Sequence, residues 1–284
     1  IIRASLRSQH LSAISEDDSV SRRSTLFGIT TLVAPSLAFG ASVPAGVGIR
    51  NADPNGPTYT LPPLGFDTAA LEPYLSKSLV EQQVAIHSEY LKTLNDAFQG
   101  KPNPIAIAKL QKEVKGNIFG EMSPQLRAAV GGHYNRCLFF RSVAPEDDYG
   151  PIAALDKAIV TDFGGTDELD AALIKAAIAV AAVGGGWVWL GATPTTNRKI
   201  AVTYTVGEDN PVMDGSLFPF LAINVNKNAY EKQYGDDVKA YVTAFNVVIN
   251  WRRVSADYLQ FSSDKSVIPC VEGDLLAAPP KSFR

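Results

Sequence analysis

Apolar residues recur at helical spacing over two long stretches of the chain. The first covers residues 76–98 and ends just before Gly100, and the second opens at Ser123 with Pro124 in its first turn and runs to Phe140. The positions that define the two faces are Leu79, Ile86, Tyr90, Leu94 and Ala97 in the first stretch and Leu126, Val130, His133, Cys137 and Phe140 in the second. Two long helices that follow each other in this way predict an antiparallel hairpin.

The pattern changes after Pro145. Short helices are expected over residues 151–163 and 167–183, strands over 186–191, 199–206 and 218–224, and helices again over 228–258. A helical hairpin followed by a helix-flanked, three-stranded antiparallel sheet is an α+β architecture in two lobes. We therefore expect a targeting or anchor segment with a linker over 1–58, a hairpin domain over 59–145, an α/β domain over 146–259 and a docking tail over 260–284.

The first 58 residues have a different character. Arg22 and Arg23 precede an uncharged, moderately apolar run over residues 24–49, and a proline-rich linker follows. A paired arginine before such a run is typical of a twin-arginine export signal, which becomes a membrane anchor if it is not cleaved. The alternative interpretation is an ordered arm that packs on a neighbouring protein.

Composition excludes several kinds of partner and site. The 26 Lys and Arg residues against 29 Asp and Glu residues give a net charge of −3, which provides no basic surplus for binding nucleic acid. Two cysteines, Cys137 and Cys270, are too few for a disulfide framework or a thiolate zinc site, and three histidines, His10, His87 and His133, are fewer than a metalloenzyme is expected to have. No cofactor is predicted from these counts.

Several strings resemble the iron/manganese superoxide dismutase family between residues 59 and 259. They are LPPLGFDTAALEPYLS from Leu61, GGHYNRCLFFRSVAP from Gly131, FGGTDELDAALIKAAIAVAAVGGGWVWL from Phe163, INVNKNAYEKQY from Ile223 and NWRRV from Asn250. The resemblance implies the family's fold, a helical hairpin followed by an α/β domain. It also implies a single iron or manganese ion held by three histidines and one aspartate.

The four positions that the resemblance marks as metal ligands carry other residues. They are Gln83 (or Gln82), Arg136, Asn224 and Asn228. An amide oxygen is a neutral, weak ligand, and a guanidinium stays protonated with no lone pair to donate. From these residues we expect a divergent family member, a pseudoenzyme without a metal, in which His87 and His133 are structural. Arg136 is expected to donate to the three amide oxygens as a polar plug, with a small bound anion as the alternative.

A family fold without its metal predicts a non-catalytic structural subunit. The N-terminal segment places it on the lumenal side of the thylakoid membrane in plastids, within a photosystem and antenna assembly, with a mitochondrial inner-membrane assembly as the alternative. The two other functions that the sequence leaves open are an active superoxide dismutase and a soluble anion-binding or sensor module.

The resemblance also bears on self-association. The positions that bridge two active sites in the family's homodimer are occupied here by Lys227 and Glu231. Two symmetric copies would bring like charges toward one axis, so the usual homodimer is not expected.

Overall fold

The computed structural model describes residues 59–99, 106–114, 122–145, 150–195, 199–262 and 267–268. All of them belong to the compact unit formed by residues 51–284. The predicted anchor over residues 24–49, with Arg22 and Arg23, and the greater part of the predicted docking tail lie outside the described residues. Among the helices of the described part, none is both long enough and apolar enough to cross a membrane.

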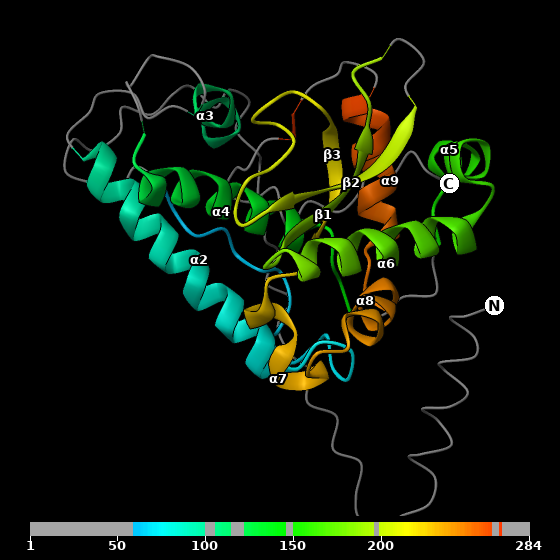
Figure 1. Ribbon diagram of the computed structural model, residues 1–284, viewed down its shortest axis with the longest axis horizontal. Coiled ribbons are helices and arrows are strands. Elements are labelled where there is room, and N and C mark those ends of the chain that lie inside the picture. The colour runs from blue at the N-terminus through cyan, green and yellow to red at the C-terminus, as the bar shows by residue number, and fades with distance from the viewer. Residues whose placement is uncertain are drawn as a thin grey trace, which may run out of the picture. The chain divides into compact units, whose positions relative to one another are not determined.

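The predicted helical hairpin is confirmed. Helix α2 covers Lys77–Phe98 and helix α4 covers Pro124–Arg141, and the two pack against each other (Figure 1). Each begins at a serine whose hydroxyl accepts a hydrogen bond from the backbone of the first turn, Ser76 from Leu79 and Ser123 from Leu126. The serine cap and the proline that follows Ser123 explain why both starts are visible in the sequence.

The connection between these helices contains a short helix that the sequence analysis missed. Helix α3 covers Ile107–Glu113 and packs on α4. It has seven residues and no side-chain cap at its start, so neither a long apolar period nor a capping motif marks it.

The predicted sheet is also present. Strands β1 (Gly186–Ala192), β2 (Ile200–Val206) and β3 (Phe218–Asn224) form an antiparallel sheet in the order β2-β1-β3. Helices α5 (Ala154–Phe163) and α6 (Thr166–Ala182) precede it, and α6 packs on β1 and β2. Every residue of β1 is buried because this strand is central and both of its faces are covered.

The region expected to be helical over residues 228–258 is divided into several pieces. The 3-10 helix η1 (Lys227–Ala229) and helices α7 (Glu231–Tyr234), α8 (Val238–Val247) and α9 (Trp251–Ser262) follow β3. Gly235 ends α7 with φ of 57°, a conformation that glycine adopts easily. The carboxylate of Asp237 then caps α8, and the side chain of Asn250 accepts from the backbone of Arg253 at the start of α9.

Helix α4 is the element that joins the two halves of the described chain. It contacts α2, α3 and β3, and every residue from Ala129 to Arg141 is buried. Polar side chains on this stretch must therefore find partners inside the protein, since water does not reach them. The candidate site residues lie here and on the facing parts of α2 and β3.

Candidate functional site

Three of the four positions marked by the resemblance meet in a chain of amide hydrogen bonds. Gln83 on α2 donates from Nε2 to the carbonyl oxygen of Asn228 at 3.1 Å and to its Oδ1 at 3.0 Å. Asn224, at the end of β3, donates from Nδ2 to Oε1 of Gln83 at 2.9 Å. Oδ1 of Asn224 in turn accepts from the backbone and side-chain nitrogens of Asn226, at 3.0 and 2.9 Å. All three amide oxygens are thus occupied by donors of the protein.

The fourth position, Arg136, belongs to a different group of contacts. Its guanidinium is fully buried and pairs with the carboxylate of Glu208, with three nitrogen–oxygen distances of 3.1 Å. It also donates to the backbone oxygen of Gly132 and lies over the rings of Tyr90 and Trp187. A buried cation is thereby matched by a carboxylate and by two aromatic faces.

Glu208 is a site residue that the sequence analysis did not identify. It follows the turn at Gly207 after β2, and its carboxylate also accepts from Trp187 Nε1 at 2.9 Å and from the hydroxyl of Tyr90 at 3.0 Å. Burial and the charge of Glu208 raise the pKa of Tyr90 to about 12. No ligand motif marks this glutamate, because its role depends on contacts with residues distant in sequence.

The expected arrangement of the polar plug is therefore wrong in one respect. Gln83, Asn224 and Asn228 do come together, but Arg136 donates to Glu208 and Gly132 rather than to their amide oxygens. The alternative of a bound anion on Arg136 rested on the lack of a carboxylate partner, and Glu208 is that partner.

The four marked positions do not fit an iron or manganese ion. Gln83, Asn224 and Asn228 offer neutral amide oxygens that already accept hydrogen bonds. The guanidinium of Arg136 brings a positive charge and no lone pair. Ions of this kind are stabilised by anionic and imidazole donors, so this donor set provides neither the charge nor the ligands.

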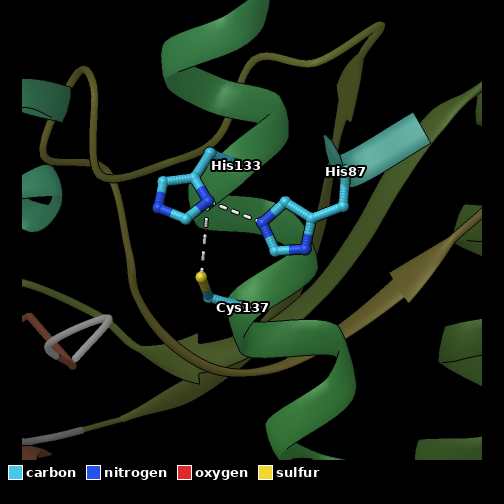
Figure 2. A group of neighbouring side chains, drawn as sticks. All are labelled: His87, His133 and Cys137. Atoms are coloured by element: carbon cyan, nitrogen blue, oxygen red, sulfur yellow. Dashed lines mark hydrogen bonds between the residues drawn. The ribbon is translucent and has the colours of Figure 1, made fainter. Parts of the chain in front are cut away.

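A second buried group contains side chains of the kinds that bind metal ions. His87 on α2 and His133 and Cys137 on α4 place their ligand atoms within 4.8 Å of one another (Figure 2). Nε2 of His87 is 2.5 Å from Nδ1 of His133, and Sγ of Cys137 is 3.8 Å from that same Nδ1. His133 and Cys137 are four residues apart and so share one face of α4.

Burial sets the charge of the two imidazoles. It lowers the pKa of His133 to about 4. Burial, His133 and the positive charge of Arg136, in that order, lower the pKa of His87 well below its usual value. Both rings are therefore neutral near pH 7, the state in which an imidazole nitrogen has a lone pair to donate. Cys137 is disulfide-bonded in this structure, and the chain's other cysteine, Cys270, lies outside the described residues.

Comparison with protein families gives two matches that follow each other along the chain. Residues 58–144 match the iron/manganese superoxide dismutase α-hairpin domain, and residues 151–257 match the C-terminal domain of the same enzymes. The first match contains α2, α3 and α4, and the second contains the sheet and most of the helices around it.

Individual relatives agree with these matches. The Mn/Fe superoxide dismutase of Methylomonas sp. (strain J) is 35% identical over 205 residues, which are 70% of this chain and 97% of that protein. The Mn superoxide dismutase of Acinetobacter baylyi is 34% identical over 203 residues, 69% of this chain and 85% of the relative. Superoxide dismutase [Mn] 1 of Leptolyngbya boryana is 29% identical over 209 residues, 70% and 80% of the two chains.

These findings correct the expectation that the chain is not an enzyme. That expectation rested on Gln83, Arg136, Asn224 and Asn228 and took His87 and His133 to be merely structural. The two domain matches and the dismutase relatives point to an enzyme, and the buried His87, His133 and Cys137 could hold a metal. The four marked positions alone do not reveal this group, because His87, His133 and Cys137 lie elsewhere on the same helices and meet only where α2 packs on α4.

Proposed function

Because the chain belongs to the iron/manganese superoxide dismutase family, we propose that it is a metal-dependent superoxide dismutase. The observation that carries the proposal is that both family domains match in order along the chain. The alignment with the Mn/Fe superoxide dismutase of Methylomonas sp. also covers 97% of that protein. Dismutation oxidises one superoxide to oxygen and reduces a second to hydrogen peroxide with two protons. It therefore needs a centre that changes its charge by one electron.

The metal in this proposal does not lie at the four marked positions, whose donors do not fit it. The group formed by His87, His133 and Cys137 supports a metal-dependent activity, since it brings two imidazoles and a sulfur together inside the hairpin. The protein's own contribution is to keep this group buried and its imidazoles neutral.

The test is superoxide consumption by the purified full-length chain. The protein is incubated separately with manganese, iron and copper, with and without a thiol-free reductant, and unbound metal is removed because free ions consume superoxide by themselves. We expect activity that follows the bound metal content and is lost in His87→Gln but retained in His10→Gln. Absence of activity with each of the three metals would overturn the proposal.

The cellular location and partners remain predictions. The lumenal side of the thylakoid membrane and a photosynthetic assembly are supported by the arginine pair at Arg22 and Arg23 and by the uncharged run over residues 24–49. Fractionation of organelles tests them directly, with removal of residues 1–49 expected to release the protein from membranes. A full-length protein that washes off as a soluble monomer would contradict both predictions.

A further inference from the structure

We propose that His87, His133 and Cys137 form a metal site that opens when the disulfide of Cys137 is reduced. In the oxidised form the sulfur is bonded to another sulfur, and in the reduced form it is a third ligand beside the two imidazoles. This inference deepens the proposed function, because it places the metal and adds thiol control, but metal binding can be measured without any activity assay.

The geometry brings the three ligand atoms within 4.8 Å of one another. Figure 2 shows the ring nitrogen of His133 facing both Nε2 of His87 and the sulfur of Cys137, at 2.5 and 3.8 Å. Metal–ligand bonds of about 2.0–2.1 Å to nitrogen and 2.3 Å to sulfur place two tetrahedral nitrogens roughly 3.3 Å apart and a nitrogen and a sulfur roughly 3.6 Å apart. The sulfur is already near that spacing, and the rings need to separate by less than about 1 Å.

The contact between the two rings is itself informative. Two neutral imidazole nitrogens at 2.5 Å can meet only if one carries a hydrogen and the other accepts it. A metal ion would take the place of this shared hydrogen, and the donor ring would then carry its hydrogen on its other nitrogen. The other nitrogen of His87, Nδ1, is buried and has no hydrogen-bond partner in the described part of the chain, so the fold alone does not satisfy this side chain.

The donor set selects a class of metal. Two imidazoles and one thiolate suit borderline and soft first-row ions such as copper, zinc and cobalt, whereas magnesium, calcium and manganese prefer oxygen donors. Within this class zinc has no redox couple, whereas copper changes between Cu(I) and Cu(II) by the one electron that dismutation requires.

An ordinary dithiol can reduce the disulfide of Cys137. The reductant gives two electrons and two protons, the sulfur–sulfur bond breaks, two cysteine thiols form, and the reductant becomes a disulfide. Binding of a divalent ion then replaces the thiol hydrogen of Cys137, and this proton passes to the solvent. Cys137 is buried, so we expect reduction to be slower than for an exposed disulfide.

Cobalt(II) is the probe, because its thiolate complexes absorb by charge transfer and it does not oxidise thiols as copper(II) does. The full-length chain is reduced under nitrogen with a phosphine. Water supplies the hydrogens of the two thiols and the oxygen of the phosphine oxide that forms, and one equivalent of cobalt is then added. We expect one tightly bound cobalt per chain and a thiolate-to-cobalt band. The oxidised protein is expected to show no such band, and Cys270→Ser is expected to show it without reductant.

Variants locate the site. Cys137→Ser is expected to abolish the band, and His87→Gln and His133→Gln to weaken cobalt binding by at least about 100-fold, since even outer residues of a metal site cost 10–100-fold. His10→Gln, which changes the chain's remaining histidine, is the matched control and is expected to leave binding unchanged. Near-ultraviolet circular dichroism checks that each variant is folded. If a variant does not fold, X-ray absorption of zinc-loaded, reduced wild-type protein decides the question, with one sulfur and two imidazoles expected.

The proposal is overturned if the reduced protein binds no stoichiometric cobalt or zinc, if the bound ion has no sulfur ligand, or if binding is equal in the oxidised protein. It is also overturned if His10→Gln removes binding as His87→Gln does. A reduced, metal-loaded protein without dismutase activity would overturn the proposed function and leave this site standing. Activity that survives Cys137→Ser and His133→Gln in folded protein would overturn this site and leave the function standing.

Discussion

Glu208 shows how a single side chain can organise a buried region. Its carboxylate accepts from Arg136, Trp187 and Tyr90, which come from α4, β1 and α2, and its backbone oxygen accepts from Asn135. A buried carboxylate with several donors and a paired cation compensates for the loss of water around both charges. The region around Arg136 is therefore an ion pair with its own partners.

Neutralising this carboxylate is expected to destabilise the protein strongly. Glu208→Gln keeps the shape of the side chain but leaves the buried charge of Arg136 without its counter-ion. The new amide also has an NH2 group in place of one oxygen, and this group cannot accept a hydrogen bond from the guanidinium. We expect the free energy of unfolding to fall by about 3–5 kcal/mol, as when one partner of a buried ion pair is removed. Urea denaturation measures the change. The control is Glu231→Gln on an exposed glutamate, and equal effects of the two substitutions would contradict the prediction.

Single residues were the level at which the sequence was least informative about the site. The strings that resemble the family located four positions, and the structure buries Gln83, Arg136 and Asn224 but leaves Asn228 exposed. The partner of Arg136 could not be predicted, because Glu208 reaches it from a loop 72 residues away and belongs to no local motif. Cys137 was noted only as part of a helical face, since the distance from its sulfur to His133 depends on how α4 is oriented.

At the scale of elements, the close packing of α4 depends on two neighbouring glycines. A Cβ atom added to Gly131 would lie 1.9 Å from the backbone oxygen of Glu208, and one added to Gly132 would lie 2.4 Å from the ring of Tyr90. The first of these neighbours is backbone and cannot rotate away. The glycine pair thus allows the loop after β2 and helix α2 to approach α4 closely enough for the Arg136–Glu208 contact.

Filling this space is expected to lower the free energy of unfolding, although helix propensity alone would raise it. Alanine within a helix is favoured over glycine by up to about 1 kcal/mol. Gly131→Ala should nevertheless lower the free energy of unfolding by about 1–3 kcal/mol or more, because overpacking forces the backbone at Glu208 to shift. Thermal and urea unfolding test this. Gly150→Ala, at an exposed glycine with open space around it, is the control, and a stabilised Gly131→Ala protein would refute the close approach.

Helices and strands were predictable where the sequence carries a repeating apolar pattern or a capping residue at their start. The hairpin helices and the strands were found within a few residues, because serine caps, a helical apolar period and β-rich runs between turn residues are encoded locally. Helix α3 and the breaks between η1, α7, α8 and α9 were not. The ends of these short helices are set by single capping residues such as Gly235 and by packing. An apolar pattern that extends over several turns does not show where such short helices begin and end.

At the scale of the whole described unit, buried contacts tie the two halves together. Arg141 on α4 forms a two-armed ion pair with Asp257 on α9, at 2.7 and 2.9 Å, and Val143 forms a β-bridge with Ile249. Gln83 binds Asn228 across the same boundary. The family matches divide between residues 144 and 151, yet charges and amides are shared across that point. The ion pair of Arg136 with Glu208 and the amide hydrogen bonds of Gln83 therefore depend on both halves being folded.

At the scale of the whole molecule, the charges of Lys227 and Glu231 bear on self-association. At the positions that the resemblance assigns to the homodimer bridge, Lys227 and Glu231 are exposed by 64% and 53% of their side chains. They pair with each other at 3.4 Å, and Lys227 also lies 3.5 Å from Asp236. A symmetric contact would remove water from these charges and bring the two copies of Lys227 toward the same axis. Exposed ion pairs contribute little free energy, so they would not compensate for this desolvation and repulsion.

We therefore expect the compact unit formed by residues 51–284 to sediment as a monomer. Sedimentation equilibrium at low and at physiological salt measures the mass, and screening of the charges by salt should not produce a dimer, because the cost also includes desolvation. Lys227→Ala is the informative variant. If the wild-type unit forms a stable dimer that Lys227→Ala dissociates, these charges are part of a working interface and the prediction is wrong. A dimer unaffected by that change would equally contradict a monomer and would place the contact on another face of the molecule.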